Sequence, residues 1–216
     1  MSDDFKKMKE HVHAGETEQL KELINKALAH GVAPMEIMEK ALRSAMEEVG
    51  QEFETLRIFL PEMIMAADTM SAGVEILRPL LAAAGGESKV GRVVLGTVSG
   101  DVHRIGKDIV RIMLEGAGFE VTDVGHDVPD DTFVAKVKEL KPNILALSAL
   151  MTTTMQNIPR VIDALKAEGV RDKVKVIVGG APVLPNWAKE IGSDGYGENA
   201  VQAVSVSKKL VGLERR

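Results

Sequence analysis

Apolar residues in the first 84 positions recur at steps of three and four, the spacing of one face of an amphipathic helix. Breaks fall at Gly15, at Gly31 and in the segment ETLRIF (residues 54–59), while Pro34 and Pro61 suit first helical turns. Short connections between amphipathic helices are typical of an antiparallel bundle. Residues 1–84 are therefore predicted to form a four-helix bundle. Its last helix is expected to bury Ile64, Ala67, Met70, Val74, Leu77 and Leu81.

The pattern changes after residues 85–91 (GGESKVG), which we interpret as a linker because they are small, glycine-rich and of mixed charge. In residues 92–216, short apolar runs alternate with amphipathic segments. Strands are predicted at 93–98, 120–124, 144–147, 174–178 and 194–196, and helices at 104–117, 131–140, 155–168, 185–191 and 199–211. This β-α alternation predicts a five-stranded parallel, doubly wound α/β domain of the Rossmann-like (flavodoxin-like) type.

Composition excludes several classes of function. The chain of 216 residues has no cysteine, so it has neither a thiol nucleophile nor a cysteine-held cluster. Its net charge of −5 argues against nucleic acid as a partner. No apolar run reaches the roughly 18–20 residues of a membrane span. The charged start MSDDFKKMKE is unlike a signal peptide, and we expect a cytoplasmic protein without a membrane partner.

A polar loop, Gly100–Gly106 (GDVHRIG), stands where the first predicted strand turns into a helix, and open parallel sheets bind ligands at that edge. The loop lacks the G-x-G-x-x-G of a dinucleotide site. Five residues separate its glycines and Asp108 follows Lys107, so it is not a phosphate loop either. One histidine and one aspartate are too few for a zinc site. Two interpretations remain: His103 is a metal ligand oriented by Asp101, or it is a loop histidine beside a helix cap.

Two further motifs follow at set distances along the chain. Between Gly106 and Ser148-x-Leu150 lie 41 residues, and between Leu150 and Gly179-Gly180 lie 28, with each motif at the carboxyl end of a predicted strand. D-x-H-x-x-G, S-x-L and G-G at these separations resemble the signature of cobalamin-binding domains in which histidine is the lower axial ligand of cobalt. The helical half resembles the cap over the cofactor in methionine synthase. The whole chain is similar to the corrinoid methyl-carrier proteins of methylotrophic methyltransferase systems, which serve methylamines, methanol and methoxy compounds.

The resemblance implies a role for each motif residue. His103 becomes the axial ligand of cobalt, and Asp101 and Ser148 extend from its ring as a relay that couples ligation to protons. Thr154 is expected only to cap a helix. The remaining cofactor contacts implied by the resemblance are Gly100, Val102, Arg104, Ile105, Gly106, Leu150, Thr152, Gly179, Gly180, Ala181, Tyr196, Phe53 and Leu60.

Several of these residues have a plainer interpretation. Phe53 and Leu60, which the resemblance places over the upper face of the cofactor, also suit the core of the bundle. Gly179-Gly180 also suits a simple turn, and Tyr196 ordinary packing.

By the same resemblance, the chain carries a methyl group on the cobalt of a cobalamin or related corrinoid. A substrate-specific methyltransferase loads it, and a second methyltransferase unloads it onto an acceptor, coenzyme M or tetrahydrofolate. A reductive activator of the corrinoid is the third implied partner, and Gly85-Gly86 is the expected hinge. The chain is then a non-catalytic carrier subunit, and its sequence names neither the methyl donor nor the acceptor.

Two alternatives share the cobalamin-binding motif. A cobalamin-dependent sensor or regulator is expected to add a DNA-binding module. The cobalamin-binding subunit of an isomerase is expected to work with a catalytic barrel. The sequence shows no segment with the pattern of either, so both rank below the methyl carrier.

Overall fold

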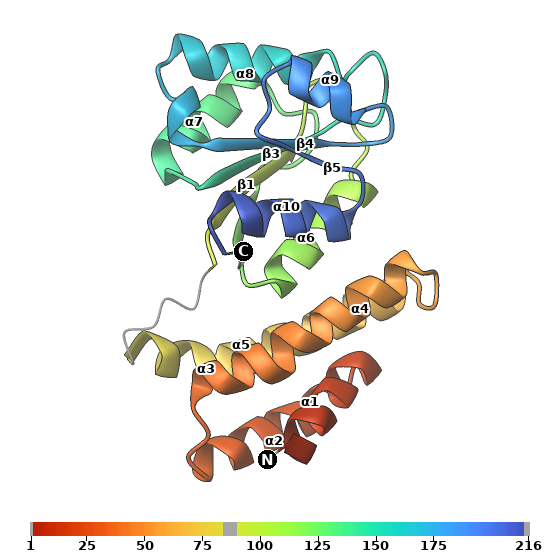
Figure 1. The fold of residues 1–216 in the computed structure, drawn as a ribbon, viewed down its shortest axis with the longest axis vertical. Helices are drawn as coiled ribbons and strands as arrows, with labels where there is room; N and C mark the ends of the chain where they lie inside the picture. Colours follow the sequence, from red (N-terminus) through yellow and green to blue (C-terminus); the bar gives the residue numbers. More distant parts are fainter. Residues whose placement is uncertain (1, 84–89, 214–216) are drawn as a thin grey trace. The chain divides into compact units, whose positions relative to one another are not determined.

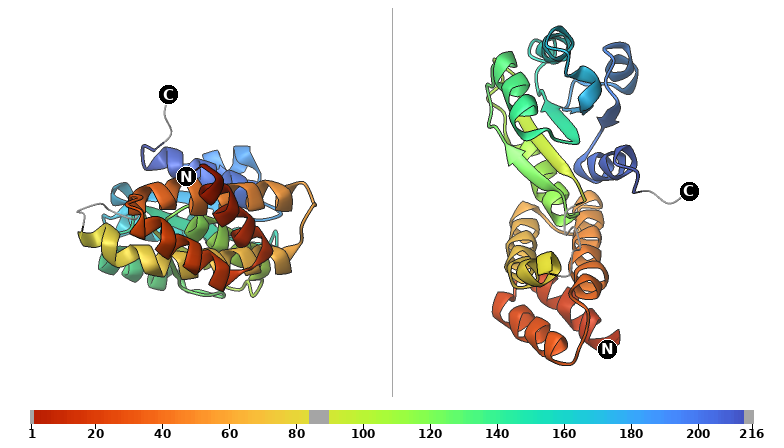
Figure 2. Two further views of the ribbon diagram at one scale, coloured as in Figure 1. Left: turned by 90° about the horizontal axis from the view of Figure 1, so that it is seen from below. Right: turned by 90° about the vertical axis from the view of Figure 1, so that its left-hand side faces the viewer.

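A computed structural model describes residues 2–83 and 90–213, and these form two compact units, one helical and one built on a sheet (Figures 1 and 2). Residues 85–89 of the predicted linker, which include the expected hinge at Gly85-Gly86, lie outside the described residues. Each unit is described by itself below.

The helical unit confirms the predicted bundle. Its elements are α1 (Ser2–Ala14), α2 (Thr17–Ala29), α3 (Pro34–Ile37), the π-helical segment η1 (Met38–Arg43), α4 (Ser44–Glu54) and α5 (Leu60–Ala83). Gly15 and Gly31 end the first two helices with left-handed φ angles of 73° and 80°. The third predicted helix runs unbroken from α3 through η1 to α4, and its π-helical turn is a feature that apolar spacing did not reveal.

Helix α5 packs through a face that differs in its first half from the one predicted. Its buried residues are Met63, Ala66, Thr69, Met70, Gly73, Leu77 and Leu81, whereas Ile64 is 39% exposed. A Cβ on Gly73 would lie 3.0 Å from the Ile24 side chain and 3.3 Å from that of Leu42. The missing side chain therefore lets α5 pack closely at Gly73, and the face opposite α2 is set by this approach rather than by the largest residues.

The second unit confirms the predicted doubly wound sheet. Its elements are β1 (Arg92–Thr97), α6 (Ile105–Gly116), β2 (Glu120–Asp123), α7 (Asp130–Leu140), β3 (Ile144–Ser148), α8 (Asn157–Ala167), η2 (Arg171–Lys173), β4 (Lys175–Gly179), α9 (Pro185–Glu190), β5 (Gly195–Gly197) and α10 (Ala200–Leu210). The five strands are parallel in the order β2-β1-β3-β4-β5. Figure 1 shows α7 and α8 on one face of the sheet and α6 and α10 on the other.

The strand order creates a switch point between β1 and β3. The chain leaves β1 for β2 on one side and returns to β3 on the other, so the loops after β1 and β3 diverge at the carboxyl edge. Thr97 pairs with Ser148, Ser148 with Gly179, and Gly179 with Gly197. These register pairs bring the ends of all three sequence motifs to one edge of the sheet.

Candidate functional site: the carboxyl edge of β1 and β3

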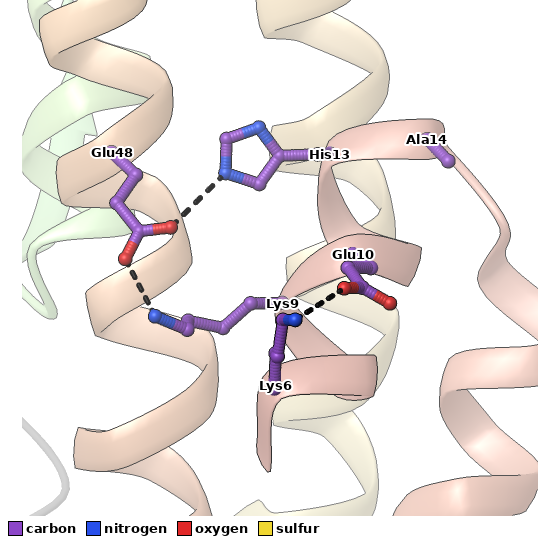
Figure 3. Close-up of a pocket in the computed structure, with 6 residues that line it drawn as sticks. All are labelled: Lys6, Lys9, Glu10, His13, Ala14 and Glu48. Atoms are coloured by element: carbon purple, nitrogen blue, oxygen red, sulfur yellow. Dashed lines mark hydrogen bonds and ion pairs between the residues drawn. The ribbon is translucent and has the colours of Figure 1, made fainter. Parts of the chain in front are cut away.

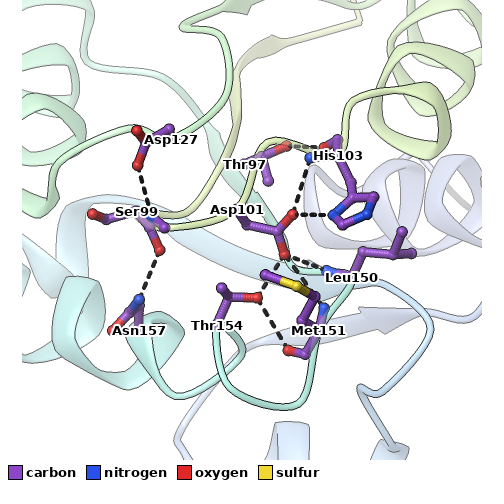
Figure 4. Close-up of polar contacts among 10 residues, drawn as sticks. Thr97, Ser99, Asp101, His103, Asp127, Leu150, Met151, Thr154 and Asn157 are labelled. Atoms are coloured by element: carbon purple, nitrogen blue, oxygen red, sulfur yellow. Dashed lines mark hydrogen bonds and ion pairs between the residues drawn. The ribbon is translucent and has the colours of Figure 1, made fainter.

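The Asp101 carboxylate lies at the centre of the site and is fully buried (Figure 4). Its Oδ1 accepts hydrogen bonds from the His103 ring Nδ1 at 2.8 Å and the His103 backbone N–H at 3.0 Å. The Thr97 hydroxyl donates to the His103 carbonyl at 3.0 Å, so both ends of this residue are held. Since a carboxylate only accepts, Nδ1 must bear the ring proton, which leaves a lone pair on Nε2.

The second carboxylate oxygen binds a different hydroxyl from the one expected. Oδ2 of Asp101 accepts from Thr154 Oγ1 at 2.6 Å and from the Leu150 N–H at 2.7 Å. The expected bond from Ser148 is thus replaced by one from Thr154, which was predicted only to cap a helix. Ser148 is a strand residue that alternates with the buried Leu147, whereas Thr154 lies in the turn before α8, with its N–H bonded to the Met151 carbonyl. The relay in this structure is therefore His103–Asp101–Thr154.

The electrostatics of Asp101 follow from these contacts. Burial by itself raises the pKa of the Asp101 carboxyl. The hydrogen bonds from the Thr154 hydroxyl, from the amides of Leu150 and His103 and from the His103 ring outweigh burial and hold this pKa well below its usual range. The carboxylate therefore stays ionised at neutral pH and keeps the imidazole in one tautomer and one orientation.

The other side of the imidazole faces outward. The His103 side chain is 46% exposed, and no described residue makes a hydrogen bond to its Nε2. Within the described residues, no group of three or more His, Cys, Asp or Glu side chains could hold a metal ion. One imidazole with a hydrogen-bonded carboxylate behind it is the donor set for a metal that arrives with its other ligands already in place.

Exposed apolar side chains lie next to His103 in the sequence and in other loops at the carboxyl edge of the sheet. Val102 and Ile105, which flank His103, are 64% and 65% exposed, and Leu150, whose N–H binds Asp101, is 43% exposed. Leu184, after β4, is 63% exposed. Exposed apolar side chains on the same edge of the sheet as the open Nε2 of His103 fit a large, flat and largely apolar ligand.

The motif glycines divide into two groups. A Cβ on Gly180, where φ is 126°, would run into the Ala149 carbonyl oxygen, and one on Gly179 would lie 2.8 Å from the Gly197 carbonyl oxygen. A Cβ on Gly106 would meet no atom within 4 Å. The fold itself therefore requires Gly179 and Gly180, while Gly106 leaves open space beside the His103 loop.

The other predicted site residues are placed as follows. Gly100, Arg104, Thr152 and Ala181 are exposed in loops at the same edge of the sheet. Tyr196 lies in β5, half-buried against the core of the sheet unit, where burial and then the Glu198 charge raise the pKa of its hydroxyl. Phe53 in α4 and Leu60 at the start of α5 are half-buried within the helical unit, and their predicted contact with a cofactor stays a prediction.

Sequence reasoning missed a buried lysine beside the loop. Lys107 is 3% exposed, and its ammonium pairs with Asp123 at the end of β2 and with Asp108 at 2.8 Å. A pattern of motifs gives no signal for such a pair, because Lys107 reads as an ordinary helix residue. The pair joins the start of α6 to the end of β2, next to the loop that holds His103.

The helical unit has an open pocket of about 470 Å³ lined by Lys6, Lys9, Glu10, His13, Ala14 and Glu48 (Figure 3). Lys9 Nζ lies 2.6 Å from Glu48 Oε1, and His13 Nε2 lies 3.6 Å from Glu48 Oε2. Lys6 and Lys9 are each paired with a carboxylate, whereas the buried His13 Nε2 has no hydrogen-bond partner among the described residues. No helix in the described part of the chain has the length and apolarity to cross a bilayer.

Fold and site together define a corrinoid-binding protein, with the open Nε2 of His103 at the switch point of the sheet. The family comparison agrees. The B12 binding domain family matches residues 91–205, and a second family of the same description matches residues 5–78. The chain therefore belongs to the B12 binding domain family, and its cofactor is a cobalamin or related corrinoid.

Individual relatives narrow the class. The trimethylamine corrinoid protein of Methanosarcina barkeri is 49% identical over 208 residues, which cover 96% of each chain. The dimethylamine corrinoid protein of the same organism is 53% identical over 178 residues, 82% of this chain and 84% of the relative. Among solved structures, a chain of the methanol:cobalamin methyltransferase complex MtaBC from M. barkeri superposes with a TM-score of 0.83 at 31% identity, covering 97% of this chain and 80% of that one.

Proposed function

We propose that this protein is a corrinoid methyl carrier of a methylamine-using methyltransferase system and that His103 is its cobalt ligand. When bound, the corrinoid supplies a cobalt centre that accepts a methyl group from one methyltransferase and gives it up to another. The observation on which the residue assignment rests is the imidazole of His103, fixed through Nδ1 by buried Asp101 and open at Nε2.

The chain's own residues tune the imidazole. Asp101, held ionised by Thr154 and by two backbone amides, draws on the Nδ1 proton and so increases electron donation from Nε2. A proton that reached this relay would weaken the donation. Coordination of a bound corrinoid by His103 would thereby be linked to the protonation of His103–Asp101–Thr154.

Apolar and small residues complete the proposed cofactor site. Val102, Ile105 and Leu150 offer exposed apolar surface to the corrin, and Gly106 leaves room for it. Other proposed contacts along the same edge are Gly100, Arg104, Ser148, Thr152, Gly179, Gly180, Ala181 and Tyr196. From the helical unit we propose Phe53 and Leu60 as the residues that keep water from the upper face.

The names of the relatives support a methylamine as methyl donor, since two of them are trimethylamine and dimethylamine corrinoid proteins. A methyltransferase partner agrees with the MtaBC complex. An acceptor methyltransferase and a reductive activator in the cytoplasm complete the proposal. The donor is tested by single-turnover demethylation of mono-, di- and trimethylamine with purified methyltransferases; transfer from methanol alone would overturn the assignment to a methylamine.

The ligand assignment is tested by reconstituting the apo-protein with hydroxocobalamin and recording its visible spectrum. His103→Ala should shift the axial-ligand bands toward those of a cofactor without imidazole. His126→Ala, which changes an exposed histidine in the next loop, is the matched control and should leave the spectrum unchanged. A wild-type protein that binds no corrinoid would overturn the proposed function. A His103→Ala spectrum identical to wild type would overturn the choice of ligand.

A further inference from the structure

We propose that Asp127 is a positioning residue for the cobalt ligand, since it fixes the backbone from which Asp101 and His103 project. The inference deepens the proposed function and rests on the role of His103 in it. Asp127 lies in the loop DVGHDVP after β2, outside the three motifs that point to the cofactor.

Asp127 binds the His103 loop through two hydrogen bonds. Its Oδ1 accepts from the Gly100 backbone N–H at 2.6 Å, and its own N–H donates to the Asp101 carbonyl at 2.9 Å. Figure 4 shows Asp127 at the side of this loop opposite Asn157. One residue thus holds a donor and an acceptor on two successive residues, which restricts both the position and the rotation of the peptide between them.

The opposite side of the same loop is held by another long-range contact. Asn157, the first residue of α8, donates from Nδ2 to the Ser99 carbonyl at 2.7 Å. The backbone of residues 99–101 therefore lies between a side chain from the β2 loop and one from α8 (Figure 4). Because Asp101 in turn binds the His103 ring, any shift of this backbone moves the imidazole.

The backbone of Asp127 itself is arranged for this contact. Its φ angle is 52°, in the left-handed region that few residues other than glycine, Asn and Asp adopt. Gly125, two residues earlier, is also left-handed with a φ of 98°. The Thr97 N–H donates to the Gly125 carbonyl at 3.0 Å, and the Val128 N–H donates to the Thr97 carbonyl at 3.1 Å. The two loops are therefore bonded along their length, with Asp127 at the end nearest the ligand.

Two substitutions separate the side chain from the backbone geometry. Asp127→Gly keeps the left-handed conformation without strain and removes only the acceptor. Asp127→Asn keeps an acceptor oxygen and tolerates the same φ, so it should rescue the contact. Lys141→Gly is the matched control, because Lys141 is also left-handed (φ 46°) and lies before β3, at the opposite edge of the sheet.

The first measurement uses apo-protein and follows amide hydrogen exchange by NMR. In Asp127→Gly the Gly100 amide should exchange about tenfold faster, since it loses a charge-assisted bond. In Asp127→Asn and Lys141→Gly it should stay within about twofold of wild type. Equal protection of Gly100 in Asp127→Gly and wild type would overturn the contact, whatever the protein does with a corrinoid.

The second measurement asks whether the contact positions His103. Wild-type and variant proteins labelled with ¹⁵N-histidine are loaded with cobalt(II) cobalamin, and the fraction with imidazole coordination is read from the nitrogen splitting in the EPR spectrum. Asp127→Gly should lower that fraction at least twofold, while unfolding by Trp187 fluorescence stays near that of Lys141→Gly. An unchanged fraction together with faster Gly100 exchange would overturn the positioning role. Absence of histidine splitting in the loaded wild type would instead overturn the assignment of His103 as cobalt ligand, on which this inference rests.

Discussion

Replacing Thr154 by valine tests the corrected relay directly. The substitution keeps the shape of the side chain and removes one hydroxyl, which donates to Asp101 Oδ2 at 2.6 Å. Thr154 is 5% exposed and Asp101 is fully buried, so water cannot replace the lost donor without opening the loop.

The expected cost follows from the contacts that remain. Hydrogen bonds to charged groups contribute about 1.5–3 kcal/mol. After the change, Oδ2 keeps the Leu150 N–H at 2.7 Å and a long contact to the Met151 N–H at 3.4 Å. We therefore expect Thr154→Val to lower the free energy of unfolding of the sheet unit by about 2 kcal/mol at pH 7. Thr153→Val, in the exposed neighbouring residue, should change it by less than about 0.5 kcal/mol.

The pH dependence gives an independent check. The pKa of the Asp101 carboxyl is lower in the folded protein than in the unfolded chain, where it is about 4. The stability that the carboxylate provides is thus fully present above about pH 4 and is lost as the pH falls toward the lower, folded-state pKa. Removing the Thr154 donor raises that folded-state pKa. The gap between wild type and Thr154→Val should therefore narrow as the pH is lowered below about 4.

The assay is urea unfolding of the apo-protein, followed by the fluorescence of Trp187. This residue is the sole tryptophan of the chain and packs against the core of the sheet unit, so its signal reports that unit. A loss in Thr154→Val no larger than in Thr153→Val would refute the relay. A gap that does not narrow in acid would refute its assignment to an ionised Asp101.

The same fluorescence signal checks two further predictions. Gly180→Ala places a Cβ against a backbone oxygen at a φ of 126° and should lose more than about 3 kcal/mol. Gly106→Ala meets open space and should unfold like wild type, with any loss confined to corrinoid affinity. Lys107→Met removes the buried ammonium from Asp123 and should lower the free energy of unfolding by about 2 kcal/mol. Lys136→Met, in an exposed pair, should cost less than about 0.5 kcal/mol. Equal free energies of unfolding for Gly180→Ala and Gly106→Ala would contradict the first prediction. Equal values for Lys107→Met and Lys136→Met would contradict the second.

Much of the fold could be predicted because it depends on local periodicity. Helices with a steady three-to-four spacing and short apolar strands were found within a few residues of their observed ends. Periodicity failed in helix α5, where the buried face includes Gly73 and begins at Met63 instead of Ile64. A glycine gives no apolar signal, although its small size decides how closely two helices approach.

The position of the site could be predicted from the sequence, but not all of its hydrogen bonds. Motif spacing placed His103, Ser148 and Gly179 at strand ends, and parallel strands bring their carboxyl ends to one edge. Spacing could not say which hydroxyl reaches Asp101, because Ser148 ends β3 and Thr154 follows in the next turn. Their orientation depends on strand alternation for one and on a turn for the other.

The sequence by itself determined the two units, the parallel doubly wound sheet and the corrinoid motif that contains the proposed ligand His103. Only the tertiary structure decided the strand order, the Thr154–Asp101 bond across 53 positions and the Asp127–Gly100 bond across 27. The spacing of apolar residues within a segment indicates which of its side chains are buried. Contacts between distant loops depend on how the sheet orders its strands and on single backbone angles, such as the left-handed φ of Asp127, which no short stretch of sequence specifies.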